Sequence, residues 1–245
     1  MFDQIKPGHV LRFGTDPATI ISPHATNAGN DNTLLTPWPT TSHLGMVQCI
    51  SHPSGPIGAV AAAVATGLRD GKNKSRSASY SGIGRLVTAS NRVVGSVNCD
   101  FVGYVDGQTN YIQSALTTFS KDFSGCLMVE YNLGGHRNVA HVAASQVPAM
   151  NCKQAFLTAL HGQHGILNHG WFRPFVFAES GRKADAYGAI KNYIGKIDDL
   201  TTFGVVTAAG VPYSIDAFKP KGVAGKDWIV TFIEQKTMSQ SWVAP

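Results

Sequence analysis

The alternation of apolar and polar positions predicts a chain built mainly of β-strands. Short apolar or alternating runs recur along most of the sequence. Turn-forming glycine, proline and asparagine residues separate them, which is typical of hairpin-linked strands. Asp106-Gly107 predicts a hairpin turn, after which the chain would return antiparallel. The runs that we expect to form strands are 10–13, 44–50, 85–105, 111–119, 126–131, 137–142, 171–178, 203–207, 211–218 and 228–235.

Two segments carry helical signals. Asn151 is a favourable helix cap, and Gln154 three residues later fits a capping box, so we expect a helix from there to Leu160. In 181–197, apolar residues recur at helical spacing and predict a second helix. The alanine-rich segment 59–68 stays ambiguous, although its alanines favour a helix. Because strands outnumber helices, the predicted fold class is α+β, with mixed or antiparallel β-sheets packed as a sandwich and a few outer helices.

Composition divides the chain into two parts. Residues 1–43 are rich in threonine, proline, asparagine and glycine, which predicts an irregular N-terminal extension. Residues 44–245 hold most of the expected strands and helices, and we expect them to form a single α+β domain that carries any catalytic site. The chain has 245 residues, of which 43% are hydrophobic. This is enough for a substantial core and argues against disorder.

Charge and cysteine content narrow the classes of function. The net charge of +5 is a mild excess, without a run of five basic residues or a nucleic-acid-binding motif, so a protein partner is favoured over nucleic acid. The four cysteines form no CxxC pair, which argues against a disulfide framework or a cysteine-based zinc site. The N-terminus lacks the pattern of a secretory signal, and the longest apolar stretch, 57–68, is too short to span a membrane.

One hairpin is expected to bring a nucleophile and a base together. Cys126 follows Ser124-Gly125 and opens an apolar run, and His141 lies in a second β-like run beyond a pair of glycines. The start of one antiparallel strand lies opposite the end of the other, so the thiol and the imidazole would meet. An imidazole that takes the proton of a thiol makes the sulfur a nucleophile. The backbone N–H groups of Gly125 and Cys126, left unpaired at the strand start, are natural donors to an oxyanion, and Ser124 and Gly125 are the expected oxyanion and substrate-binding residues.

Ser124-Gly125-Cys126 with a histidine on a downstream strand resembles the bacterial toxin glutamine deamidases of the cytotoxic necrotizing factor type. Burkholderia lethal factor 1 and the chemoreceptor deamidase CheD look like more distant relatives. The resemblance covers roughly residues 120–145 and implies that Cys126 is the nucleophile and His141 the general base. In some of these relatives a hydroxyl residue six positions before the cysteine holds the histidine, and here that residue is Ser120.

The resemblance implies a protein glutamine deamidase that acts as a bacterial toxin or effector. Cys126 would attack the carboxamide of a target glutamine, and water would hydrolyse the thioester to leave glutamate. The mechanism uses no metal and no other cofactor. The partner is a protein substrate with a reactive glutamine, and small GTPases and translation factors are substrates within the wider family. The protein would be secreted without a cleavable signal peptide and act in the cytosol of a target cell, or stay in the bacterial cytoplasm.

Four alternatives remain open from the sequence. The same thiol–imidazole pair would serve a cysteine peptidase or amidase of the papain-like or cell-wall type. A non-catalytic protein-binding domain would use Cys126 only as a small buried side chain. Cys152, in the first turn of the expected helix, is a second candidate nucleophile because a helix dipole lowers a thiol pKa. His161, His164 and His169 form a rival zinc site, although no carboxylate lies nearby to support it.

Overall fold

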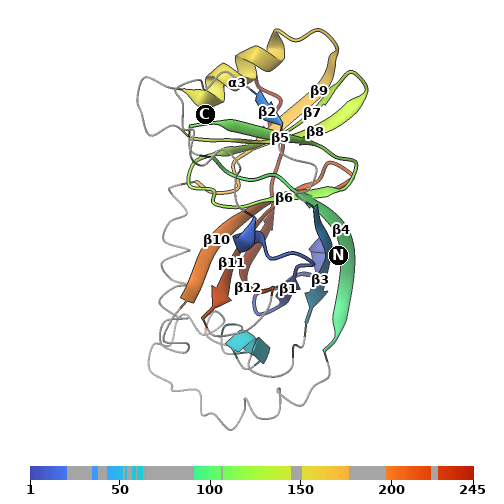
Figure 1. Cartoon of the computed structure of the whole chain (residues 1–245), viewed down its shortest axis with the longest axis vertical. Helices are drawn as coiled ribbons and strands as arrows, with labels where there is room; N and C mark the ends of the chain where they lie inside the picture. The colour runs from blue at the N-terminus through green and yellow to red at the C-terminus, as the bar shows by residue number, and fades with distance from the viewer. Residues whose placement is uncertain are drawn as a thin grey trace.

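The structure, a computed structural model, arranges its strands as a closed barrel and a five-stranded sheet that lies over one end of the barrel (Figure 1). None of the helices among the described residues is long and apolar enough to cross a membrane. The described residues are 1–20, 35–37, 43–51, 53, 57–58, 60–62, 64, 91–105, 107–144, 151–176, 197–221 and 226–245.

Seven strands close the barrel. β1 completes the ring, because it pairs with β3 on one side and with β12 on the other. The pair β4–β6 runs parallel, whereas the other neighbours in the ring run antiparallel. Around the ring the strands are β1 (Val10–Arg12), β12 (Asp227–Gln235), β11 (Pro212–Pro220), β10 (Ile197–Val206), β6 (Thr117–Ser120), β4 (Val93–Phe101) and β3 (His43–Ile50).

Large apolar side chains fill the barrel. Phe203 and Val205 on β10, and Trp228 and Val230 on β12, belong to one buried cluster, as the two-residue repeat of a strand requires. The rings of Phe203 and Trp228 meet edge to face with their centroids 5.1 Å apart. The interior is therefore a packed core.

The first twenty residues contribute to this core. Phe2 (in the 3₁₀ turn η1, Phe2–Gln4) stacks on Tyr213 with centroids 5.1 Å apart, and Phe13 packs edge to face on Phe119. A second 3₁₀ turn, η2 (Pro17–Thr19), follows β1. The strand predicted at 10–13 is confirmed as β1. The predicted domain boundary at residue 43 stays a prediction, because 21–34 and 38–42 lie outside the described residues.

The sheet packs one face against helix α3 (Cys152–His161). Leu127 and Val129 on one strand and Ala140 on the next meet Phe156 and Leu157 of the helix in a single buried cluster. Figure 1 shows α3 on the side of the sheet away from the barrel. In order across the sheet the strands are β2 (Leu35–Pro37), β5 (Thr109–Gln113), β8 (His136–Val142), β7 (Leu127–Leu133) and β9 (Ile166–Phe172).

The other face of the sheet packs on the end of the barrel. Met128 of β7 and Phe123, in the link from β6 to β7, belong to the buried cluster that fills this junction. Gly204 of β10 lets the two layers approach closely, because a Cβ there would lie 2.8 Å from the Met128 sulfur and 2.9 Å from the Phe123 ring. Both distances are shorter than real Cβ contacts.

Replacing Gly204 with alanine should destabilise the protein by about 1–3 kcal/mol, because the added methyl group overpacks this junction. Urea denaturation followed by circular dichroism would measure the change in free energy of unfolding. Gly162→Ala is the matched control, since its Cβ would have its nearest neighbours at 3.7 Å and the φ there is −77°. Equal stability of the two variants would contradict close packing at Gly204.

Several predicted elements are confirmed and others are wrong. The strand expected at 171–178 ends at Phe172, and the run 111–119 is divided between β5 and β6, which lie in different sheets. The strands expected near 44–50, 203–207, 211–218 and 228–235 are present as β3, β10, β11 and β12, and the predominance of strands with a few helices holds. The sandwich is corrected, because β1 joins distant strands and closes the larger sheet on itself. The hairpin expected at Asp106-Gly107 is also wrong, since β4 lies in the barrel and β5 in the other sheet. The helix expected at 181–197 falls almost wholly outside the described residues.

Candidate functional site

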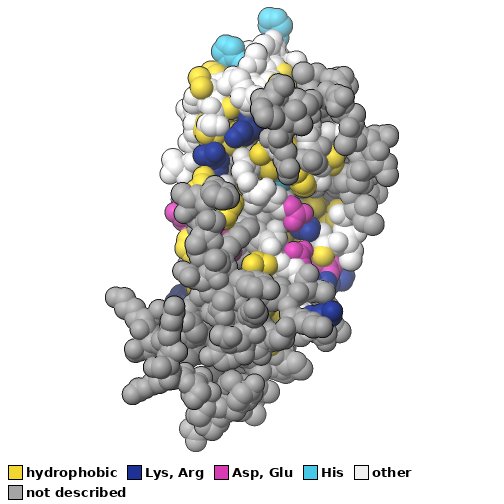
Figure 2. All heavy atoms as spheres, turned by 90° about the vertical axis from the view of Figure 1, so that its left-hand side faces the viewer, with side chains coloured by type: hydrophobic (Ala, Val, Ile, Leu, Met, Phe, Trp, Pro, Cys, Tyr) yellow, Lys and Arg dark blue, Asp and Glu magenta, His cyan; other side chains and the backbone are white. Residues whose placement is uncertain are grey.

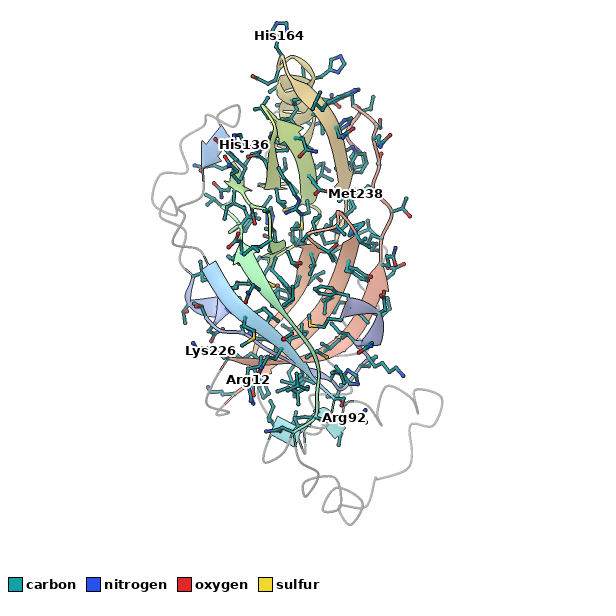
Figure 3. The ribbon with its side chains drawn as sticks, turned by 90° about the vertical axis from the view of Figure 1, so that its right-hand side faces the viewer. Arg12, Arg92, His136, His164, Lys226 and Met238 are labelled. Atoms are coloured by element: carbon teal, nitrogen blue, oxygen red, sulfur yellow. The ribbon has the colours of Figure 1, made fainter. Side chains whose placement is uncertain are left out.

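The predicted hairpin of Cys126 and His141 is present as β7 and β8. Gly134 and Gly135 form its two-residue turn, with φ values of +59° and +83° that glycine adopts without strain. His136 opens β8 beside this turn and is exposed (Figure 3). The register places Met128 directly opposite His141.

Cys126 and His141 lie on the same face of the sheet. Residues directly opposite in an antiparallel pair point to one face, and so do residues two apart on one strand. Cys126 precedes Met128 by two residues, and Met128 pairs with His141. Cys126 and Met128 also belong to the same buried cluster, at the junction with the barrel. The thiol and the imidazole are thus diagonal neighbours on the face that meets the barrel.

Ser120 reaches the imidazole from the barrel. It ends β6, where it pairs with Gly204, and its Oγ lies 2.7 Å from Nδ1 of His141. The ring of Phe123 stacks on the imidazole at 4.1 Å between centroids with a 6° interplanar angle. Tyr104 packs on it at 5.1 Å. One hydrogen bond and two rings therefore fix the plane of the imidazole.

The other nitrogen of His141 is unsatisfied. Nε2 is buried and has no hydrogen-bond partner among the residues that the structure describes, and His141 is 1% exposed. Burial lowers the pKa of His141 from its ordinary value of 6.5 to about 3, because an apolar environment disfavours the charged ring. The imidazole is therefore neutral at physiological pH, with one ring nitrogen available to a further partner.

Cys126 is also buried, at 1% exposed. Its Sγ accepts a hydrogen bond from the backbone N–H of Ala144 at 3.2 Å. Burial raises the pKa of the thiol, while the N–H groups of Ala144, Ser124 and Cys126 itself, together with the charge of Lys153, oppose that rise. Several backbone donors thus converge on the sulfur and partly offset the effect of burial on its pKa.

The segment before Cys126 adopts unusual backbone conformations. Asp122 has a φ of +69°, and its N–H donates to Thr201 Oγ1 at 3.0 Å. Gly125 has a φ of +138°, which a side chain would strain. Ser124 is exposed, and Gly125 is half-buried. This turn carries the chain from the barrel strand β6 to the sheet strand β7.

The structure brings the predicted site residues together, except that the expected thiol–imidazole hydrogen bond is not formed. Ser120 meets His141, and Ser124 and Gly125 adjoin Cys126. The Cys126 sulfur bonds to Ala144, and Nε2 of His141 bonds to nothing in the described part of the chain. The pair therefore shares a face of the sheet without a hydrogen bond between the sulfur and the ring nitrogen.

A second thiol–imidazole pair was missed from the sequence. Cys49 Sγ lies 3.5 Å from Nδ1 of His9, because Cys49 on β3 pairs with Leu11 of β1. Burial raises the pKa of the Cys49 thiol to about 12. The two residues are forty positions apart, and no local pattern links such distant strands. Cys49 lies in the packed barrel core, which favours a structural role.

The alternative candidates from the sequence, Cys152 and the three histidines of the expected zinc site, lie apart from Cys126 and His141. Cys152 is buried in the first turn of α3, and its Sγ lies 3.8 Å from the Gly107 carbonyl oxygen. His161 and His169 both pack on the ring of Trp242, at 4.6 Å and 3.5 Å between centroids. His164 projects from the tip of the α3–β9 connection (Figure 3). Within the described residues, no three histidine, cysteine or acidic side chains are grouped so that they could hold a metal ion.

A hollow of about 430 Å³ opens on the sheet beside residues 130–132 of β7 and 168–170 of β9. Glu130, Asn132 and Asn168 line it, and Arg137 closes one wall through a 2.5 Å ion pair with Glu130. Arg137 also donates to the carbonyl oxygens of Ser114, Leu116 and Thr207, which ties the sheet to the barrel.

Figure 2 shows histidine side chains exposed at the end of the molecule farthest from the barrel. Cys126 and His141 belong neither to the hollow nor to this group of exposed histidines.

Comparison with known proteins gives no relative: no family model, no curated protein and no solved structure matches the chain.

Proposed function

We propose that this protein is a glutamine deamidase that acts on another protein. The observation that carries the proposal is the arrangement around His141. Ser120 Oγ lies 2.7 Å from Nδ1. Within the described part of the chain, Nε2 has no hydrogen-bond partner, and it lies on the sheet face that Cys126 shares. A nucleophile, a base and a group that orients the base are the three parts that covalent amide hydrolysis needs.

The proposed mechanism assigns one role to each of these residues. His141 donates its Nδ1–H to Ser120, which leaves the lone pair on Nε2 to take the proton of the Cys126 thiol. The sulfur then attacks the carbonyl carbon of the glutamine carboxamide, and backbone N–H groups near Ser124 and Gly125 stabilise the oxyanion. The C–N bond breaks as His141 returns the proton to the departing nitrogen, which leaves as ammonia. Water hydrolyses the thioester, so that the target residue becomes glutamate and the thiol is restored.

The resting site holds a neutral thiol and a neutral imidazole. Burial raises the pKa of Cys126 and lowers that of His141, so a preformed thiolate–imidazolium pair is disfavoured. Proton transfer therefore belongs to the step in which the sulfur attacks. Since Cys126 is 1% exposed, the substrate must also displace the atoms that cover the sulfur before it reacts.

The substrate class comes from the resemblance noted above. A protein glutamine in an exposed segment is the partner, and small GTPases and translation factors are the first proteins to try. The reaction needs no metal or cofactor. An effector delivered into the cytosol of a target cell would meet such substrates. An amine that reaches the thioester before water would give transglutamination by the same route.

The direct test is to incubate the protein with purified small GTPases and translation factors and to measure ammonia release and substrate mass. A small mass gain on one glutamine with an intact backbone supports deamidation. New fragments would instead identify a cysteine peptidase, which uses the same pair of residues.

Burial favours a second candidate, a non-catalytic protein-binding domain. All four cysteines are buried, and Cys126 is as inaccessible as the others. In such a domain Cys126 would pack as a small apolar side chain.

Alkylation separates the two candidates. For a deamidase we expect iodoacetamide to modify Cys126 at least about tenfold faster than Cys49, Cys99 or Cys152. An opening that admits the substrate would also admit the reagent, and the backbone donors and Lys153 partly offset the burial that raises the pKa of this thiol. Peptide mass spectrometry over a time course would give the four rates. Equal, slow modification of all four would support the binding domain instead.

A further inference from the structure

Asn110 lies beside His141 at the centre of the candidate site. It pairs with His141 across β5 and β8, so that the two side chains point to the same face of the sheet. Ile112, two residues further on β5, joins Cys126 and Met128 in the cluster on that face. Asn110 is fully buried, at 0% exposed. An asparagine in such a place normally has every polar atom satisfied.

One half of the Asn110 amide is bound and the other is free. Its Nδ2 donates to the carbonyl oxygen of Gly103 at 3.1 Å. That carbonyl can only accept, so the amide is fixed with Oδ1 turned away from it. Among the described residues, Oδ1 has no hydrogen-bond partner. Nε2 of the neighbouring His141 is likewise unsatisfied. Two orphaned polar atoms on adjacent residues indicate a missing polar ligand, since leaving them buried and unpaired is unfavourable.

We propose that Asn110 is a substrate-binding residue whose Oδ1 accepts an N–H of a primary carboxamide, so that the site selects glutamine over esters and substituted amides. This inference rests on the proposed deamidase function. A primary carboxamide offers two N–H donors. One N–H bonds to Asn110, and the nitrogen then lies next to Nε2 of His141, which delivers the thiol proton to it as the C–N bond breaks.

A buried hydrogen-bond acceptor discriminates against substrates that lack a matching N–H donor. A buried acceptor that bonds an N–H is left unpaired when an analogue lacks that donor, and the site then disfavours the analogue. An ester of the same size would leave Oδ1 of Asn110 unsatisfied. Amides in a peptide backbone have a single N–H and carry a carbon substituent where the second hydrogen of glutamine would lie. The same group therefore disfavours main-chain cleavage.

The experiment compares two alkylating probes of similar size, iodoacetamide and methyl iodoacetate, which differ in the presence of N–H donors. The rate at which each modifies Cys126 is measured by mass spectrometry and divided by its rate with glutathione, which removes intrinsic reactivity. In the unmodified protein we expect Cys126 to favour iodoacetamide by roughly tenfold, the effect of one hydrogen bond. Cys49, Cys99 and Cys152 serve as internal controls with no preference.

Two variants assign the preference to Asn110. Asn110→Ala should remove it, so that the two rates at Cys126, each divided by the rate with glutathione, become equal. Asn138→Ala is the matched control, since Asn138 is also buried and also donates to a backbone carbonyl, that of His136. Asn138 is two residues from Ala140, whose face packs on α3, so it lies on the opposite face from Cys126. Its loss should leave the preference intact.

The outcomes are distinct. A preference that is present in the unmodified protein, lost in Asn110→Ala and kept in Asn138→Ala supports the inference. Cys126 could instead be modified faster than the other cysteines but show no preference between the two probes once each rate is divided by the rate with glutathione. That result overturns the role of Asn110 and leaves the deamidase proposal standing. Modification of Cys126 no faster than the other cysteines overturns both. If Asn110→Ala does not fold, the ratio in the unmodified protein still decides.

Discussion

Replacing Cys126 with serine should lower the rate of deamidation by roughly 10³-fold or more, because a serine hydroxyl is a far poorer nucleophile at neutral pH than a thiol aided by a base. His141→Ala should have a similar effect, since the thiol then has no proton acceptor. The rate is measured as ammonia released from a substrate protein, with unfolding curves to show that each variant folds.

Two variants serve as controls for this result. Cys152→Ser removes a buried thiol from α3, and His136→Ala removes an exposed imidazole from the same hairpin. Both should keep nearly full activity. Full activity in Cys126→Ser, or its loss in Cys152→Ser alone, would assign the chemistry to another residue.

Acid should destabilise the protein through His141. The folded-state pKa of about 3 lies below the ordinary value of 6.5, so the unfolded chain binds a proton between these values while the folded chain does not. The stability that this residue contributes is thus complete above about pH 6.5 and falls by about 1.4 kcal/mol per pH unit below it. The loss reaches roughly 4 kcal/mol near pH 3.5.

Urea denaturation at several pH values would measure this slope. His141→Phe keeps a ring in contact with Phe123 and Tyr104 but cannot take up a proton, so the free energy of unfolding of this variant should vary less with acid. His169, whose pKa burial also lowers, adds a smaller effect of the same sign in both proteins. His136→Ala is the exposed control. Parallel pH profiles for the unmodified protein and His141→Phe would show that His141 is not the source.

Local signals predicted the hairpin and the helix well. The glycine pair at the β7–β8 turn sets a two-residue connection, and this fixes which residues face each other. Asn151 caps α3 as expected, with its Oδ1 accepting from the Gln154 N–H at 3.1 Å. In both cases a few adjacent residues determine the geometry.

Long-range pairings were not predictable in the same way. Gly107 does adopt a positive φ of +67°, as the turn signal at this position required. A turn signal says that the chain changes direction, but it does not say which strand the next segment will join. Here β4 pairs with β6, and β5 pairs with β2 and β8. The closure of the barrel by β1 depends in the same way on strands far along the chain.

In the candidate site, too, the residues that share a hairpin were predictable, and the residues brought in by long-range strand pairing were not. Cys126 and His141 share one hairpin and were placed together by spacing alone. Asn110 enters through β5, whose partner strand the sequence did not reveal. Cys49 and His9 meet through the pairing of β1 with β3, which no periodicity shows.

Because β1 is held between β3 and β12, the order of synthesis matters for this protein. The first strand leaves the ribosome more than two hundred residues before its partner at 227–235 is made. Until then the barrel is open, and β6, the strand that carries Ser120, belongs to an incomplete sheet. A nascent chain would therefore hold Cys126 and His141 on their hairpin but without the anchored hydroxyl beside the imidazole. If the protein is a deamidase, the unfinished polypeptide should lack that activity until residues 227–235 have been made.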